Sequence, residues 1–339
     1  MNMRSIAKLA GVSLSTVSKA FSGSGEISDS TRQRIFDIAK EHGLYDIYKK
    51  NKFPKRVIAV ICPELENDFF IEVIKLLDTK LRERDCVMLL AISHYKVERT
   101  EEFISYYTAY NKVDGIICMC PSTNLKNPSL IPGVVIFGGR RHKFDGWTQI
   151  KSDMYSSIKA AVYKLKELGH TDIGFACEDY TKGKLEDFKH ALRSAALPLR
   201  AEWIGTSHEK FEQGGEEIAN RWLDSGRVPT GIIVSNDYKA IGLINAFKKR
   251  GVRVPEDVSV VGIDDIRLAA SFEPPLSSIR TDYDEICSKA VDILIKKIDN
   301  QYYNPIEDTA VSTCFILRES IGECRVIVEK IVEKIDENE

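Results

Sequence analysis

Between residues 57 and 299, short apolar runs alternate with longer amphipathic segments, and this alternation limits the possible folds more than any other feature of the sequence. The run 57–62 is apolar throughout, as in a strand that is covered on both faces, and a helical pattern follows it from Phe70 to Arg84. Further strands are predicted at 86–92, 115–119, 133–137, 172–177, 201–204, 231–235 and 258–263, and further helices at 97–110, 153–168, 183–195, 212–225, 237–250 and 282–299. Regular alternation predicts a mostly parallel sheet with helices on both faces. Because residues 57–320 are many for one such sheet, we expect two α/β lobes, with a ligand cleft beyond the carboxyl ends of their strands.

The first 45 residues follow a different pattern, that of three short helices. Gly11 follows the amphipathic run 5–10, for which Ser5 is the expected N-cap, and it can adopt the positive φ of a tight turn. Ser13 can then cap a second helix that turns Val17 inward, which makes a helix-turn-helix or, on the simpler interpretation, an ordinary helical hairpin. The outward positions of the second helix are small, hydroxylated or cationic and suit the major groove of DNA: Leu14, Ser15, Thr16, Ser18 and Lys19.

A third helix and a linker complete this region. Ser28 or Asp29 opens a helix that is predicted over 31–41, with Gly43 as its C-cap. Residues 44–56 are polar and basic without clear periodicity, so we predict a linker between the N-terminal region and the α/β lobes.

The net charge of −2 conceals an uneven distribution. Residues 1–56 carry eleven Lys or Arg against five Asp or Glu, a net of +6, whereas the remaining 283 residues carry 37 against 45, a net of −8. A small basic region on a larger acidic body is expected when only the basic region binds a polyanion. A polybasic membrane anchor would also be basic, but these charges are dispersed, and no lipidation signal or long apolar span accompanies them.

The cysteines do not indicate a metal site. The eight are scattered, mostly in strand-like runs; Cys118 and Cys120 would share one face of a strand, but no second pair or His cluster completes a tetrahedral site. We therefore expect buried, reduced thiols, no metal and no cofactor. The N-terminus lacks the organisation of a secretory signal, so we expect a cytoplasmic protein.

Several motifs resemble those of the lactose/galactose repressor (LacI/GalR) family. The runs Ile6–Lys19 and Ile27–Arg32 resemble the family's DNA-binding head. Similar motifs follow in the family's order: Pro63 with Asn67-Asp68-Phe69-Phe70, Leu168-Gly169-His170, Asn236-Asp237 with Ala240-Ile241-Gly242, the run Val254–Asp265, Pro274-Pro275-Leu276 and Arg318-Glu319-Ser320. The resemblance covers residues 3–320 in one order, which chance does not explain.

The resemblance implies a sequence-specific transcription regulator, a repressor, that acts as a homodimer on double-stranded operator DNA. Its fold would be an N-terminal all-α helix-turn-helix head followed by an α/β two-lobed body like that of type I periplasmic binding proteins. A small-molecule effector between the lobes would change the affinity for the operator. The expected parts are a DNA-binding domain over 1–45, a linker or degenerate hinge over 46–56, an effector-binding and dimerisation domain over 57–320 and a helical tail over 321–339.

By this resemblance, base readout falls to three residues of the second helix. Leu14 would touch a thymine methyl group, Ser15 would donate or accept a hydrogen bond, and Lys19 would reach either guanine or only a phosphate. Contacts to the DNA backbone are assigned to Ser5, Ser13, Thr16, Ser28, Thr31 and Arg32.

The positions that match the family's effector pocket are Phe69, Phe70, Lys184, Phe211, Asn236 and Asp264, with Phe211 aligned at an offset of one residue. Aromatic faces stack on sugar rings, while carboxylate and amide groups bond to hydroxyls, so we expect a sugar or sugar-like effector. One of the two adjacent phenylalanines is expected in the core, and Asp265 is expected to be structural while Asp264 faces the cleft. Lys184 and Asp187 stand where the family usually has arginine and glycine, so bidentate recognition by arginine is lost.

The linker and the tail depart from the family pattern. The family's hinge, Gly-Tyr-x-Pro-Asn and then Ala-x-x-Leu, inserts leucines into the minor groove, but residues 43–54 lack both the Pro-Asn and that leucine. Either Ile47 or Phe53 replaces it, or the segment is a basic tether that follows the phosphates, which its composition favours. In the tail, apolar residues spaced by three and four predict a short coiled-coil seam: Ile321, Cys324, Val328, Ile331 and Ile335. A tetramer through this seam, a helix packed on the body and a frayed end are the alternatives.

Two other function classes fit less well. A solute-binding component of a transporter would share the two-lobed body but not the basic head. An enzyme is not indicated, because the sequence has no Gly-rich phosphate loop, no Gly-x-Ser-x-Gly elbow and no metal cluster. The Asp264-Asp265 pair suits ligand binding and turn formation better than acid–base catalysis.

Overall fold

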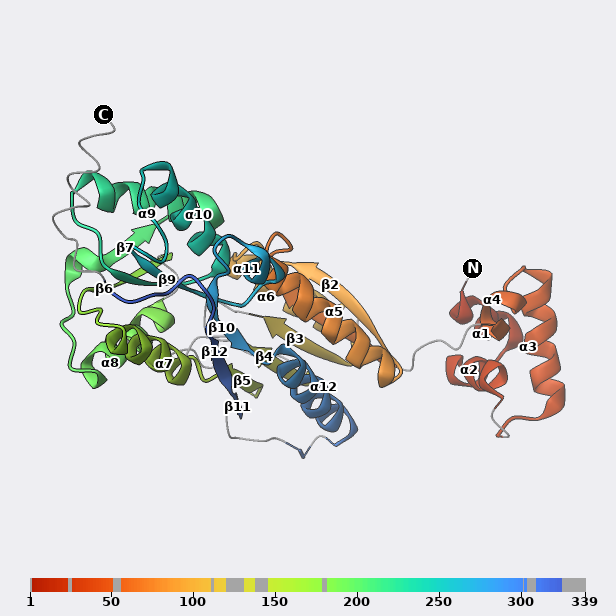
Figure 1. The fold of residues 1–339 in the computed structure, drawn as a ribbon. Coiled ribbons are helices and arrows are strands. Elements are labelled where there is room, and N and C mark those ends of the chain that lie inside the picture. Colours follow the sequence, from red (N-terminus) through yellow and green to blue (C-terminus); the bar gives the residue numbers. More distant parts are fainter. Residues whose placement is uncertain are drawn as a thin grey trace. The chain divides into compact units, whose positions relative to one another are not determined.

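The structure is a computed structural model that describes residues 2–23, 26–50, 56–110, 113–119, 131–137, 146–178, 182–300, 302–303 and 309–324 (Figure 1). The chain folds into two compact units, of which the first holds Met1–Arg56 and the second nearly all of the remainder. We call these units the head and the body.

The head is helical, with α1 (Met3–Ala10), α2 (Leu14–Ser22), α3 (Asp29–Glu41) and α4 (Tyr45–Lys50). Gly11 ends α1 with a φ of 62°, and the Ser13 hydroxyl caps α2 by accepting a hydrogen bond from the Thr16 amide at 3.1 Å. Ile6, Val17 and Ile35, one from each of the first three helices, are fully buried. The predicted helix-turn-helix is therefore present.

The start of α1 differs from the prediction. Asn2, not Ser5, is the N-cap, because its side-chain oxygen accepts from the Ser5 amide at 3.1 Å. Leu9, which the helical pattern placed on the inner face, is 56% exposed. Ser5 thus lies inside the first turn of α1, with its hydroxyl 3.3 Å from the Asn2 side chain.

The linker prediction is wrong for residues 46–50, because Tyr45–Lys50 forms the helix α4. Tyr45 and Tyr48 lie three residues apart, so both turn to the same side, where their rings lie 6.3 and 5.4 Å from the ring of Phe21. The Phe36 ring lies 5.1 Å from Tyr45. Fewer than two helical turns give too little periodicity to detect in the sequence. Residues 51–55, including the alternative wedge Phe53, lie outside the described residues.

The first lobe of the body, the N-lobe, is built on a sheet with the strand order β11-β5-β4-β3-β1-β2. Strands β1, β3, β4, β5 and β11 run parallel. The side chains of Ala59, Ile61 and Ile116 pack toward α6, while α12 packs on α5 and on strands β3 and β4. Its elements are β1 (Arg56–Cys62), α5 (Asp68–Glu83), β2 (Cys86–Ile92), α6 (Val97–Ala109), β3 (Gly115–Met119), β4 (Gly133–Ile136), β5 (Thr148–Ser152), α12 (Tyr283–Asp299) and β11 (Thr309–Val311).

The second lobe, the C-lobe, has the strand order β12-β10-β9-β8-β6-β7, with β12 antiparallel to β10 and the other pairs parallel. Helices α7 and α8 cover one face, where Ile233 packs, and α9, α10 and α11 cover the other, where Ile232 and Val234 pack. Its elements are α7 (Met154–Glu167), β6 (Ile173–Glu178), α8 (Lys182–Ser194), η1 (Ala201–Trp203), β7 (Ile204–Ser207), α9 (Phe211–Asp224), β8 (Gly231–Val234), α10 (Asp237–Lys249), β9 (Ser259–Ile263), α11 (Arg267–Ser271), β10 (Ser277–Thr281) and β12 (Thr313–Ile316).

The predicted strands and helices of the body occur within two residues of their expected bounds, with one exception. Residues 201–203 form a 3₁₀ turn, and the strand β7 follows it. Strands β5, β10, β11 and β12 were not predicted. Within the described residues the chain passes between the lobes three times: after β5, after β10, and between β11 and β12. A hydrogen bond connects the first and the third of these segments, because the Thr313 hydroxyl donates to the Asp153 carbonyl at 2.7 Å.

The beginning of the expected helical tail is not helical. Ile321–Cys324 runs along the C-lobe, where the Cys324 amide donates to the Leu168 carbonyl at 2.8 Å and a ring nitrogen of His170 lies 3.1 Å from the Gly322 carbonyl. The tail prediction is therefore wrong for these four residues. The remainder of the predicted seam, Val328, Ile331 and Ile335, lies outside the described residues.

Candidate DNA interface and effector site

The outward face of α2 is the candidate DNA interface. Leu14 is 42% exposed and Ser15 is exposed, while Val17 faces the core, so the helix presents the predicted base-reading positions away from the core. The side chain of Lys19 is 44% exposed and lies one helical turn beyond Ser15. A helix with small and cationic exposed side chains can enter a major groove.

Lys19 has a partner within the head. Its ammonium group donates a hydrogen bond to the carboxylate of Glu26, which lies between α2 and α3. This hydrogen bond and the charge of Lys19 lower the pKa of Glu26. Exposed pairs of this kind contribute little stability, so a phosphate or a guanine edge can take the place of the carboxylate.

Most of the predicted DNA-backbone contacts lie at the N-terminal ends of α2 and α3. The Ser13 hydroxyl is 2.8 Å from that of Thr16, the Ser28 hydroxyl donates to that of Thr31 at 2.8 Å, and Arg32 lies 3.8 Å from Asp29. Helix N-termini carry partial positive charge and unpaired amide groups, which favours phosphate nearby. Ser5 is apart from this group, in the first turn of α1.

The polar half of the candidate effector site lies beyond the carboxyl ends of β6, β8 and β9. The Lys184 ammonium donates to the Ser235 carbonyl at 2.7 Å and lies 3.7 Å from the Asp264 carboxylate, whose side chain is 13% exposed. Burial raises the pKa of Asp264 to about 6; Lys184 acts against this rise and Glu178 adds to it. The structure thus brings two predicted effector residues together as an ion pair.

Asn236 lies in the same cluster, but both ends of its amide have partners. Its oxygen caps α10 by accepting from the Lys239 amide at 2.8 Å, and its nitrogen donates to Glu178 at 2.6 Å. Glu178 also accepts from the Ser235 hydroxyl at 2.6 Å and lies 3.4 Å from the ammonium group of Lys239. Asn236 therefore has a fixed orientation, and Glu178, which the sequence did not single out, fixes it.

Aromatic side chains form the opposite, N-lobe side of the site. The Phe69 ring lies 5.0 Å from that of Phe137 and 5.2 Å from that of Tyr283. Phe70 is only 4% exposed and packs between Phe69 and Tyr95, so it belongs to the core of the lobe. Of the two adjacent phenylalanines, Phe69 is the one placed to meet a ligand.

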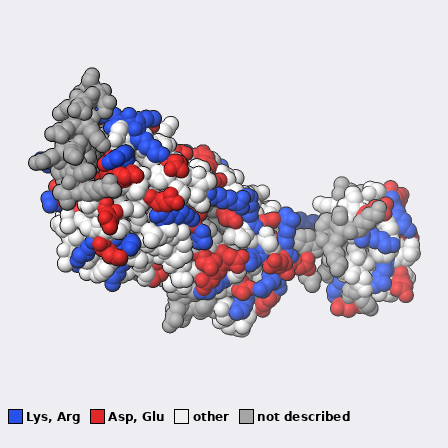
Figure 2. Space-filling view, in the orientation of Figure 1, with Lys and Arg blue, Asp and Glu red and all other residues white. Residues whose placement is uncertain are grey.

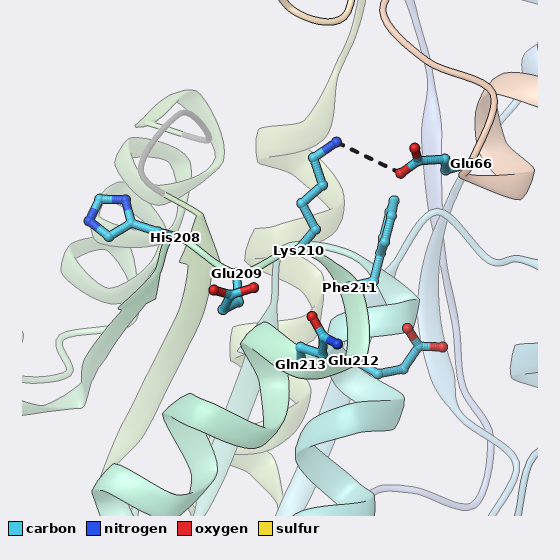
Figure 3. Close-up of a pocket in the computed structure, with 7 residues that line it drawn as sticks. All are labelled: Glu66, His208, Glu209, Lys210, Phe211, Glu212 and Gln213. Carbon is cyan, nitrogen blue, oxygen red and sulfur yellow. Dashed lines mark ion pairs between the residues drawn. The ribbon is translucent and has the colours of Figure 1, made fainter.

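Phe211 lies in a different setting from the other predicted effector residues. It lines a cavity of about 420 Å³ together with Glu66, His208, Glu209, Lys210, Glu212 and Gln213. Figure 3 shows Lys210 extending toward Glu66, 3.9 Å away, and Lys210 also pairs with Glu64 at 2.8 Å. Since Glu64 and Glu66 belong to the N-lobe, this cavity lies where the two lobes meet.

Asp265 differs from Asp264 in its surroundings. Its side chain is 1% exposed, pairs with Arg318 at 2.6 Å and also contacts Arg280. Its backbone amide donates to the Ser278 hydroxyl at 3.0 Å. Two guanidinium groups thus hold this carboxylate inside the C-lobe, which agrees with a structural part in the turn.

Neither a metal-ion cluster nor a membrane-spanning helix is found among the described residues. Among them, no group of three or more His, Cys, Asp or Glu side chains is arranged to hold a metal ion. Nor does this part of the chain contain a helix with both the length and the apolar character that a bilayer span requires. On the face of the body visible in Figure 2, acidic and basic side chains are interspersed.

Four residues of the site escaped the sequence analysis: Phe137, Glu178, Lys210 and Tyr283. Phe137 and Glu178 stand at the ends of predicted strands, where ligand contacts are expected, so their positions were the available signal. Tyr283 begins the helix that follows an unpredicted strand. Lys210 had no signal apart from its place beside Phe211.

Two family profiles match the sequence. That of the bacterial regulatory proteins of the lacI family covers residues 2–45, and that of the periplasmic binding protein-like domain covers residues 162–321. The ribose operon repressor of Haemophilus influenzae is 30% identical in an alignment that is 336 residues long, and the match covers 94% of this chain and 98% of that protein.

Solved structures share the fold. The lac repressor dimer bound to operator and the anti-inducer ONPF has a TM-score of 0.75 at 19% identity, over 95% of this chain and 99% of that one. A LacI family transcriptional regulator from Enterococcus faecium with bound ribose has a TM-score of 0.68 at 24% identity, over 80% and 100%. The predicted fold class, a helix-turn-helix head and a two-lobed periplasmic-binding-protein-like body, is confirmed.

Proposed function

The chain belongs to the lacI family of bacterial regulatory proteins, and from that premise we propose that it is a cytoplasmic transcriptional repressor whose affinity for operator DNA is controlled by a small sugar-like effector. The observation that carries the proposal is the similarity to the ribose operon repressor over 94% of the chain, which includes the head and the body in one order. A regulator of this kind needs no catalytic step, and we assign it none.

The head is proposed to read the operator through α2. Leu14 and Ser15 are exposed on the outward face and are assigned to base edges, while Lys19 is assigned to guanine or phosphate after release from Glu26. The remaining contacts, to phosphates, are assigned to Ser5, Ser13, Thr16, Ser28, Thr31 and Arg32. The homodimer would present two heads to the two halves of a palindromic site.

The effector is proposed to bind between the polar C-lobe cluster and the aromatic N-lobe side. Phe69 would cover the apolar face of a sugar ring, and Lys184 and Asp264 would bond its hydroxyls. Asn236 and Phe211 are assigned to the rim, and Phe70 supports Phe69 from the core. A relative is named for the ribose operon and a structural neighbour holds ribose, so D-ribose is the first sugar to test.

A selection of binding sites from random double-stranded DNA tests the DNA-binding function. We expect the full-length protein to enrich a palindromic sequence, and Leu14→Ala and Ser15→Ala variants to prefer altered bases at defined positions. Uniform weakening in both variants would assign these residues to the DNA backbone, and the absence of any enriched sequence would contradict the proposal.

Thermal unfolding with sugars tests the effector. A ligand that binds only the folded state raises the unfolding temperature with concentration. D-ribose, D-xylulose and cellobiose are compared with sugar phosphates and nucleobases; stabilisation by one sugar that is lost in Asp264→Ala supports the site. Stabilisation that persists in Asp264→Ala would place the ligand elsewhere.

The solution mass with and without residues 325–339 decides between a dimer and a tetramer held by the tail.

A further inference from the structure

Asp264 is held in a backbone conformation that its side chain does not favour. Its φ is +107° and that of Asp265 is +51°, both in the region that suits glycine. Such residues persist only where the surrounding structure fixes them. Within the C-lobe, the Asp264 amide donates to the Ile279 carbonyl at 2.9 Å, and the Asp265 amide donates to the Ser278 hydroxyl at 3.0 Å.

A further restraint on this turn comes from the other lobe. The Tyr283 hydroxyl donates to the Asp264 carbonyl at 2.9 Å. Tyr283 is the first residue of α12, which Asp282 caps by accepting from the Glu285 amide at 2.9 Å, and α12 packs on α5 and on β3 and β4 of the N-lobe. Burial, with the nearby Asp264 carboxylate, raises the pKa of Tyr283 well above its ordinary value, so this hydroxyl remains a donor.

The ring of Tyr283 continues the connection into the N-lobe. It lies 5.2 Å from the ring of Phe69 and 6.3 Å from that of Phe137, in edge-to-face arrangements. Phe69 is in the first turn of α5, where its amide donates to the Asn67 cap at 2.9 Å. One tyrosine therefore touches the backbone of the carboxylate that is assigned to the effector and the aromatic residue that is assigned to the effector's apolar face.

We propose that Tyr283 is a positioning residue. Through its hydroxyl, it couples the backbone position of Asp264 in the C-lobe to the first turns of α5 and α12 in the N-lobe. The inference rests on the proposed effector site. An effector that replaces Lys184 as the partner of Asp264 shifts the strained turn, and the hydrogen bond to the Asp264 carbonyl transmits this shift to Tyr283 and Phe69. Such coupling needs contacts that differ between the bound and free states, and this carbonyl supplies one.

Tyr283→Phe removes the hydroxyl and keeps the ring. The control is Tyr163→Phe, because the Tyr163 hydroxyl also donates to a backbone carbonyl, that of Ser194 at 2.7 Å, but within the C-lobe. Amide hydrogen exchange of the full-length protein without ligand is the first readout. In Tyr283→Phe we expect exchange to rise about two- to tenfold both at residues 264–266 and in the first turn of α5, as expected for the loss of one hydrogen bond. Tyr163→Phe should leave both segments unchanged.

The second readout is operator affinity, measured with the selected DNA and with saturating D-ribose. The change in affinity caused by ribose, taken relative to the affinity of the same variant without ribose, should fall several-fold in Tyr283→Phe and should keep its wild-type size in Tyr163→Phe. Faster exchange confined to residues 264–266, or in neither segment, would overturn the coupling. If D-ribose does not bind the wild type, the sugar assignment fails, while the exchange experiment still decides on Tyr283.

Discussion

At the scale of single residues, Lys19 contacts Glu26 in the head without DNA, and we propose that it contacts guanine or phosphate in the DNA-bound head. We expect Lys19→Gln to weaken operator binding about tenfold and to lower the slope of log affinity against log salt by about one, since one cationic contact to DNA is lost. Glu26→Gln is the matched variant: it removes the same ion pair from the other side, together with a negative charge beside a residue that is proposed to contact DNA, so binding should be unchanged or tighter. Affinity is measured by fluorescence anisotropy between 50 and roughly 200 mM salt. Equal weakening in both variants would make the pair a structural requirement of the head.

The buried pair Glu178–Lys239 gives a second residue-scale prediction, since the two side chains are 3% and 0% exposed. Removal of Lys239 weakens the compensation of a buried carboxylate, whereas removal of both charges avoids this cost. Lys239→Met should lower the free energy of unfolding by about 3–5 kcal/mol, and Glu178→Gln with Lys239→Met should recover most of it. Urea unfolding followed by tryptophan fluorescence measures this, because Trp203 and Trp222 lie in the C-lobe. If the double variant is no more stable than Lys239→Met, the Glu178 carboxylate stabilises the C-lobe through the hydrogen bonds that it accepts from Asn236 and Ser235, and not through its ion pair with Lys239.

At the scale of elements, the sequence pattern predicts the strands that are continuously apolar and misses a strand whose residues are polar but buried. Strands β1 and β8 are recognisable from their apolar runs. Strand β10 is not, although Ser277 and Ser278 are both 0% exposed, because their polar groups are satisfied by distant residues: the Ser278 hydroxyl donates to Asp237 at 2.6 Å, and the Ser277 amide donates to Ser320 at 2.8 Å.

The candidate site shows the same division. Asn236 and Asp264 were assigned to the effector by the family resemblance, and each follows a predicted strand, at whose carboxyl end ligands are expected. The contacts of Glu178 and Tyr283 depend on pairs 58 and 19 residues apart, so only the folded chain reveals them.

Helices α9 and α10 meet through glycines, which gives a prediction at the scale of elements. A Cβ atom at Gly242 would lie 2.0 Å from the Glu212 carbonyl oxygen, which is backbone and cannot move aside without separating the helices. Gly242→Ala should therefore lower the free energy of unfolding by at least about 2 kcal/mol. Gly183→Ala in α8 is the control, since a Cβ there meets nothing within 4 Å, and it should be neutral or stabilising by about 0.5–1 kcal/mol. Urea unfolding compares the two; similar small effects would show that α9 and α10 can separate at low cost.

At the scale of the whole molecule, contacts in several places join the lobes across the site. Lys210 pairs with Glu64, and the Tyr238 hydroxyl donates to Asp68 at 2.8 Å. Both N-lobe partners lie in or beside the loop that leads into α5 and Phe69. An effector bound next to Phe69 thus lies where the lobes are held together. Such a ligand can shift the equilibrium between two arrangements of the lobes only if its contacts differ between the two arrangements.

If Asp264 binds the effector as proposed, its pKa of about 6 predicts that effector affinity depends on pH, and the stability of the fold can be measured over the same pH range. Sugar hydroxyls donate to the ionised carboxylate, so affinity should be constant above about pH 7 and should fall below pH 6, approaching tenfold per pH unit. The folded-state pKa of about 6 lies above the ordinary 3.8, so the folded protein binds the extra proton, and acidification through this window does not destabilise it through Asp264. His170 acts in the opposite sense: burial lowers its pKa, so its contribution to stability is present above its ordinary 6.5 and declines as the pH falls below that value.

Calorimetric titration of the stabilising sugar between pH 5 and about 8, with the unfolding temperature recorded at each pH, separates the two effects. In Asp264→Asn the affinity should be weaker at high pH and nearly independent of pH, because the amide does not titrate. In His170→Gln the affinity should keep the wild-type dependence while the loss of stability in acid becomes smaller. A wild-type affinity that falls only in step with the unfolding temperature would assign the pH dependence to the fold, through groups such as His170, and not to the carboxylate that faces the effector.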